Sequence, residues 1–183
     1  MESIMSRQSG FTIVELMIVL AIVGILITVA IPSFRDQMER RRLIGAAELV
    51  YEQLSYAKSE ALKRQEPICA KFTSTAFGIT DKDPCDCDPS IVDSGNASAC
   101  TLASDVDDSD VLLRRWDFSD FPGVSSSNTF TGGLVEFEPI RGTASTGTVT
   151  LASANHSIGV VMSAMGRVRM CSPNLGGYPD NCP

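Results

Sequence analysis

Two arginines near the C-terminus, Arg167 and Arg169, are the charged pair best placed for binding chemistry. They alternate with Val168 and Met170, so a β-strand would direct both guanidinium groups to one face and the apolar side chains to the other. Guanidinium groups about 7 Å apart match the repeat of adjacent phosphates on one nucleic-acid strand, and arginine binds phosphate in a bidentate manner. Arg141 would add a contact if the fold brings it nearby. The alternative is the polar outer face of an ordinary strand.

The charge of the whole chain restricts any nucleic-acid site to a local patch. The 183 residues include 15 Lys plus Arg and 22 Asp plus Glu, for a net charge of -7. Eleven aspartates lie between Asp81 and Asp120, whereas residues 141–169 hold three arginines and no acid. Binding of nucleic acid through the whole surface is therefore not expected.

Six cysteines outside the apolar N-terminal segment predict disulfide bonds in an oxidising compartment. Cys171 and Cys182 flank a loop rich in proline and glycine, so we expect these two to bond to each other. Cys85 and Cys87 are separated by one residue, and a bond between them would be strained. They are expected to pair, in an order that the sequence leaves open, with the two remaining cysteines, Cys69 and Cys100.

The other residues with metal-binding or catalytic chemistry do not form a convincing site. A zinc site on Cys85, Cys87 and Cys100 would depart from the usual ligand spacing. The aspartates after Thr80 lack the glycine and glutamate of an EF-hand, which favours a solvated acidic loop over a calcium site. His156, the single histidine, lies in a predicted turn with no nucleophile motif nearby. We therefore expect no enzyme activity, no metal and no cofactor.

A long N-terminal helix is the first element that the sequence predicts. Residues 11–31 carry one charge, Glu15, and as a helix of about 31 Å they could cross a bilayer. Apolar residues then recur at spacings of three and four, which predicts an amphipathic continuation that ends before Pro67. We expect a helix over residues 11–66, with residues 11–31 as its transmembrane half.

Residues 67–183 are predicted to form a β-rich globular head with a disulfide-stapled tail. The segments typical of strands are separated by turn residues, which favours antiparallel pairing. The fold class is therefore α+β, a long helix packed on an antiparallel β-sheet. The expected strands are Ile68–Phe72, Val111–Trp116, Leu134–Ile140, Thr148–Leu151, Ile158–Met162 and Arg167–Cys171.

The N-terminal segment has three interpretations. A secretory signal peptide could be cleaved after Ala30. However, such a peptide begins with a net positive charge, and here the negative charge of Glu2 offsets the positive charge of Arg7. Glu15 also interrupts the apolar run. An ordinary membrane anchor is the second interpretation. The third comes from Gly-Phe-Thr-Ile-Val-Glu, starting at Gly10 and followed by the apolar run, which resembles the class III signal of type IV pilins and pseudopilins.

This resemblance implies that residues 1–10 are a leader, removed by a prepilin peptidase between Gly10 and Phe11, and that Phe11 is then N-methylated. It also implies a role in assembly for Glu15. A carboxylate at bilayer depth costs about 2.5–3.5 kcal/mol on insertion scales, and the new amino group of Phe11 could pair with it within one chain or between subunits. The alternative for Glu15 is a charge tolerated near the membrane interface.

Motifs in the head resemble the GspH/FimT group of minor pilins and pseudopilins. They begin at Leu134 (LVEFEP), Gly147 (GTVTL), Ile158 (IGVVMS) and Gly166 (GRVR). The resemblance covers nearly the whole chain except Thr80–Asp110, which is interpreted as an insertion. It implies the type IV pilin fold and a minor pilin that primes pilus assembly near the tip. The alternative is a GspH-like minor pseudopilin of a type II secretion system with no DNA role.

The same resemblance implies the partners and the location. The partners are other pilins, the prepilin peptidase and the inner membrane, which the chain crosses once with a periplasmic head before it joins an extracellular pilus. Some FimT proteins of naturally transformable bacteria bind DNA through Gly-Arg-x-Arg, which implies DNA contacts by Arg167 and Arg169, with Arg141 as a further contact if it lies nearby. No aromatic residue lies between Phe137 and Tyr178, so we expect sequence-independent binding without base stacking.

Overall fold

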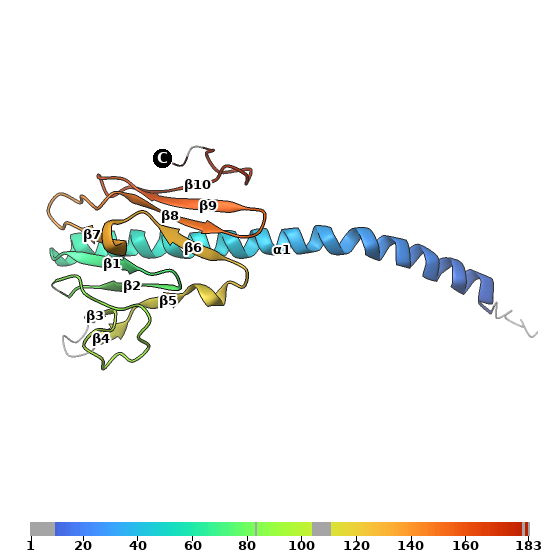
Figure 1. Cartoon of the computed structure of the whole chain (residues 1–183), viewed down its shortest axis with the longest axis horizontal. Coiled ribbons are helices and arrows are strands. Elements are labelled where there is room, and N and C mark those ends of the chain that lie inside the picture. Colours follow the sequence, from blue (N-terminus) through green and yellow to red (C-terminus); the bar gives the residue numbers. More distant parts are fainter. Residues whose placement is uncertain (1–9, 83, 104–110, 181, 183) are drawn as a thin grey trace, which may run out of the picture. The chain divides into compact units, whose positions relative to one another are not determined.

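The computed structural model describes residues 10–82, 84–103, 111–180 and 182. The chain divides into two compact units, Met1–Met38 and Glu39–Pro183. Within the described residues one α-helix precedes a series of strands (Figure 1). The elements are α1 (Ile13–Arg64), β1 (Ile68–Phe72), β2 (Ala76–Thr80), β3 (Thr101–Ala103), β4 (Val111–Leu113), β5 (Arg115–Asp117), β6 (Ser125–Asn128), β7 (Leu134–Phe137), β8 (Gly147–Ala152), β9 (Ser157–Met162) and β10 (Val168–Cys171), with short 3₁₀ helices at Phe118–Asp120 and Thr131–Gly133.

The first unit contains the apolar part of α1. The helix starts at Ile13, and the hydroxyl of Thr12 caps it by accepting a hydrogen bond from the Glu15 N–H at 3.3 Å. Its large apolar side chains are exposed on every side, and an 18-residue window has a mean hydropathy of 2.9. By length and composition it is the one helix of the described chain that could cross a membrane. The helix predicted for this region is confirmed.

In the second unit, the C-terminal half of α1 forms one wall of the core. The helix ends at Arg64; Gln65 takes the left-handed conformation, with φ 57°, and Pro67 follows. The apolar stripe predicted from the sequence is buried, with at most 1% of each side chain exposed, and three of its members are alanines that admit close packing. The stripe consists of Leu43, Ala47, Val50, Leu54, Ala57 and Ala61.

Two four-stranded antiparallel sheets complete this core, with orders β5-β2-β1-β7 and β10-β9-β8-β6 (Figure 1). Strand β7 therefore joins a different sheet from β8, β9 and β10, which follow it in the chain. The predicted strand Val111–Trp116 is wrong as a single element: it is broken at Arg114, so that β4 pairs with β3 and β5 pairs with β2. Strand β10 lies at an edge of its sheet.

A glycine in the first sheet lies against a disulfide. A Cβ added at Gly78 would overlap the Cβ and Sγ of Cys100 and would lie 3.1 Å from the Arg114 carbonyl oxygen. We expect Gly78→Ala to lower the free energy of unfolding by about 1–3 kcal/mol, because overpacking forces its neighbours apart. Urea unfolding of the detergent-solubilised protein, followed by the fluorescence of Trp116, measures the change.

The matched control for this substitution is Gly176→Ala. No atom lies within 4 Å of a Cβ added at Gly176, and its φ is not positive. The control should unfold within about 0.5 kcal/mol of the parent, since surface substitutions away from special features have small effects. Equal free energies of unfolding for the two variants would show that the close packing at Gly78 does not contribute to stability.

Candidate functional site

An open groove of about 640 Å³ lies in the second unit between the C-terminal half of α1 and strand β10. Helix side chains form one wall, the edge strand forms another, and the C-terminal tail closes one part of the rim. Of the described residues that line it, three carry a positive charge and none carries a negative charge. The lining residues are Tyr51, Ser55, Lys58, Gly166, Arg167, Val168, Arg169, Met170, Tyr178 and Pro179.

Arg167, in the turn before β10, and Arg169, in β10 itself, alternate with apolar residues as the sequence predicts. Arg167 and Arg169 are exposed, whereas Val168 and Met170 are half-buried and pack against the core. Among the described residues, no carboxylate lies within 4.0 Å of either guanidinium group or of the Lys58 amine. These three cations are therefore available to an anionic ligand.

The turn that precedes β10 holds the arginine pair beside α1. Gly166 has a φ of 63°, and a side chain there would overlap the Gly142 carbonyl oxygen, so the turn requires glycine. The Lys58 Nζ donates to the carbonyl oxygen of Met165 at 3.4 Å. These contacts fix the helix against the start of β10.

Arg141 lies near this cluster but outside the groove. It is exposed and is followed by Gly142, which contacts Gly166 across two turns. The Ala144 N–H donates to the Ala164 carbonyl oxygen at 3.1 Å, which joins the same two turns. Lys58, which the sequence does not single out, lines the groove from a half-exposed helix face that it shares with other lining residues.

The C-terminal tail is fastened beside the arginines. Cys171 pairs with Cys182, which is the pairing expected from the sequence. The Ser172 N–H donates to the Pro179 carbonyl oxygen at 2.9 Å, and the Ser172 hydroxyl donates to the Ser157 carbonyl oxygen at 2.6 Å. Tyr178, one residue before Pro179, is therefore held at the rim of the groove.

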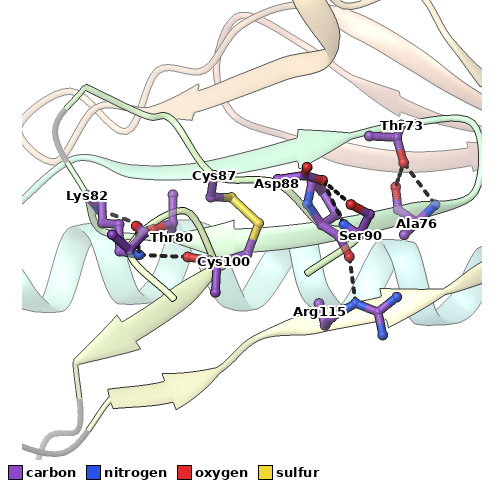
Figure 2. Close-up of a disulfide and its surroundings, with 12 residues drawn as sticks. Thr73, Ala76, Thr80, Lys82, Cys87, Asp88, Ser90, Cys100 and Arg115 are labelled. Carbon is purple, nitrogen blue, oxygen red and sulfur yellow. Dashed lines mark hydrogen bonds between the residues drawn. A yellow bond between two sulfur atoms is a disulfide. The ribbon is translucent and has the colours of Figure 1, made fainter. Parts of the chain in front are cut away.

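The predicted insertion is cross-linked to the first sheet. Cys69 pairs with Cys85, and Cys87 pairs with Cys100. This is one of the two pairings that the sequence left open. Figure 2 shows the second disulfide beside Lys82, whose Nζ donates to the carbonyl oxygens of Ala97 and Ala99, both at 2.7 Å. With all six cysteines in disulfides, no thiolate remains for a zinc site.

Several aspartates of the insertion serve as hydrogen-bond acceptors. Asp88 accepts from the hydroxyl and the N–H of Ser90, and these bonds lower the pKa of Asp88 (Figure 2). Asp81 accepts from the Ala103 N–H at 2.8 Å and lies 3.5 Å from Arg64 at the end of α1. Within the described part of the chain, no three His, Cys, Asp or Glu residues are grouped to hold a metal. Asp83 and residues 104–110 lie outside that part.

The N-terminal motif surrounds the start of α1. Gly10 and Phe11 are exposed ahead of the helix, and Glu15 is exposed in its first turn. Thr12 and Glu15 have the spacing of a helix-capping pair, a structural role that the sequence analysis did not identify. The expected leader falls mostly on residues 1–9, which lie outside the described residues.

Two family models match the sequence. The prokaryotic N-terminal methylation motif matches residues 5–31, which include Gly10, Phe11 and Glu15. The model described as type II transport protein GspH matches residues 46–166. This second match covers the buried half of α1 and strands β1 to β9, and it stops just before the arginine pair.

Relatives and solved structures extend these matches. A fimbrial protein of Pseudomonas aeruginosa is 38% identical over 80 residues, covering 42% of this chain and 52% of the relative. A type IV major alpha-pilin of Moraxella bovis is 29% identical over 79 residues, covering 42% and 50%. The chain thus spans about half the length of the curated relatives it matches.

Among solved structures, the minor pseudopilin EpsH from the type 2 secretion system of Vibrio cholerae gives a TM-score of 0.50 at 10% identity, covering 73% of this chain and 99% of EpsH. The type IV minor pilin FimU of Pseudomonas aeruginosa gives 0.49 at 19% identity, covering 74% and 96%. The likeness to EpsH confirms the expected fold, a long N-terminal helix with antiparallel sheets.

Proposed function

The chain belongs to the family described as type II transport protein GspH, and from this premise we propose that it is a minor subunit of a type IV pilus. In this proposal residues 1–10 are the leader, residues 11–66 the helix and residues 67–183 the head. Before assembly the subunit lies in the inner membrane with a periplasmic head. It then joins other pilins and primes assembly near the tip of the pilus.

One observation carries this proposal: the apolar start of α1, with one carboxylate in its first turn, lies within the segment that matches the methylation motif. Exposed apolar surface of this extent needs lipid or neighbouring helices around it. A filament whose subunits pack by their N-terminal helices supplies those neighbours after the chain leaves the membrane. Three disulfides in the head support a periplasmic location for it.

Processing of the leader tests the first step. We expect Gly10→Trp to block cleavage and Gly10→Ala to allow or slow it, because a peptidase site specific for glycine excludes a bulky side chain. Mass spectrometry of the protein from cells measures whether Phe11, N-methylated, is the mature N-terminus. Gly24→Trp, which alters a glycine inside the helix, is the control that should not affect cleavage. A mature N-terminus at another residue would overturn the proposal.

We also propose that the groove beside β10 binds the phosphate backbone of DNA through Arg167 and Arg169. The support is the groove itself, where both guanidinium groups and the Lys58 amine line one surface without an acidic residue among the described lining. Arg141 is exposed in a turn that contacts the turn before β10, and in this proposal it extends the positive surface beyond the groove. No described aspartate of the stretch Asp81–Asp120 lines the groove, so these acids do not oppose DNA within it.

A second candidate function is a minor pseudopilin of a type II secretion system, favoured by the description of the matching family. Deletion of the gene separates the two proposals. Loss of surface pili with normal secretion of exoproteins supports the pilus subunit, and loss of secretion with normal pili supports the pseudopilin. The prepilin peptidase and the inner membrane are partners in both cases.

A further inference from the structure

The groove beside β10 contains aromatic side chains that the sequence did not lead us to expect there. Tyr51 on α1 and Tyr178 in the tail line the same surface as Arg167 and Arg169. The sequence alone predicts no base stacking, because no aromatic residue lies between Phe137 and Tyr178. Folding brings Tyr51 to them from a distant part of the sequence.

Both tyrosines are placed so that a flat ligand could reach them. Tyr51 is 37% exposed, and Tyr178 is half-buried with part of its side chain against the core. The Cys171–Cys182 disulfide and the hydrogen bond from Ser172 to Pro179 hold the tail that carries Tyr178. A ring that is already held in place loses little freedom when a base stacks on it.

We propose that this groove binds single-stranded DNA in preference to duplex DNA, with phosphates on Arg167, Arg169 and Lys58 and bases stacked on Tyr51 and Tyr178. The inference rests on the proposed DNA-binding function of the same groove. Sites for single strands combine a basic groove along the backbone with aromatic rings for the bases. In a duplex the bases are already stacked on one another, so the tyrosines could not reach them unless the strands separated.

The charges around the groove favour one strand over two. The three cations that line it can neutralise only a few phosphates. A second row of phosphates would therefore gain few favourable contacts with the described lining.

The test compares a fluorescein-labelled 12-nucleotide strand of mixed sequence with its own duplex, by anisotropy at 50 mM salt on the detergent-solubilised full chain. We expect the single strand to bind at least about tenfold more tightly than the duplex, since stacking of one base can supply that factor. Tyr51→Leu and Tyr178→Leu should each weaken binding of the single strand about tenfold and change duplex binding less than twofold. Tyr51→Phe, which keeps the ring, should bind like the parent.

The third tyrosine of the chain supplies the matched control. Tyr56 lies under the guanidinium group of Arg114, 5.1 Å from ring centroid to Cζ, and does not line the groove. Tyr56→Leu should leave binding of the single strand unchanged. Thermal unfolding of each variant distinguishes loss of a contact from loss of the fold.

The outcomes separate this inference from the function on which it rests. Equal binding of strand and duplex, or full binding by the leucine variants of Tyr51 and Tyr178, would overturn the single-strand preference. If binding still requires Arg167 and Arg169 in that case, the groove contacts only the backbone and the proposed function stands. Failure of the parent protein to bind either form would overturn both.

Discussion

Replacing Glu15 with alanine is expected to leave the chain processed and inserted in the membrane, yet to exclude it from filaments. Residues 11–31 hold no other charged group. Cleavage after Gly10 would create an amino group at Phe11, close to the positive end of the helix dipole, where a carboxylate is the natural partner. Loss of that partner should reduce the amount of subunit in sheared filaments at least tenfold. Immunoblots of filament and membrane fractions measure it.

A neighbouring substitution separates assembly from helix capping. The Thr12 hydroxyl accepts from the Glu15 N–H, so Thr12→Ala removes the cap and keeps the carboxylate. Loss of an N-cap costs about 1 kcal/mol of helix stability and should leave assembly largely intact. Glu15→Gln, similar in size but uncharged, should behave like Glu15→Ala. Normal amounts of Glu15→Ala in filaments, or an equal defect in Thr12→Ala, would contradict a charge-based role in assembly.

The helix could be predicted closely because its pattern is local. Apolar residues at spacings of three and four define a buried stripe whatever the stripe packs against, and the six positions of that stripe are all buried. Pro67 set the C-terminal end to within a few residues, since a proline restricts the residue before it. The observed bounds, Ile13–Arg64, lie within two residues of those expected at each end.

The strands in which apolar and polar residues do not alternate were not predicted from the sequence. Strand β2, Ala76–Thr80, is buried at every position, so neither face has a polar pattern. Strand β6, Ser125–Asn128, contains no apolar residue and belongs to its sheet only through pairing with β8. The break at Arg114 also has a tertiary cause, because its N–H donates to Cys100 and its carbonyl oxygen accepts from Ile79. Such contacts depend on partners remote in sequence.

Only part of the groove could be predicted from the sequence, because some of its lining residues come from parts of the chain that are remote from the arginines. The alternation around Val168 could be read locally, and it correctly directed Arg167 and Arg169 outward. Lys58 and Tyr51 reach the groove only because the helix packs beside the edge strand, which no local pattern specifies. A site that is assembled from a helix and a strand distant in sequence can therefore be predicted only in part from local patterns.

Replacing both Arg167 and Arg169 with glutamine is expected to abolish DNA binding by the groove at low salt. Each guanidinium group is exposed, lacks a carboxylate partner among the described residues, and can contact a phosphate in a bidentate manner. Shifts of labelled DNA on native gels, with the detergent-solubilised protein, measure the loss. The amount of the variant in filaments should equal that of the parent, because neither arginine supports the core.

The salt dependence of binding gives this prediction a second measurement. Two to four phosphate contacts should give a modest negative slope of log affinity against log salt, about −0.9 per contact for duplex and about −0.7 per contact for a single strand. Arg141→Gln, which changes an exposed arginine outside the lining, should reduce the magnitude of the slope by one contact at most. Affinity of one head should be micromolar or weaker, so that useful capture would require several copies or neighbouring subunits acting together. If the double variant binds DNA like the parent, the two arginines are ordinary surface residues and the groove beside β10 is not the DNA-binding site.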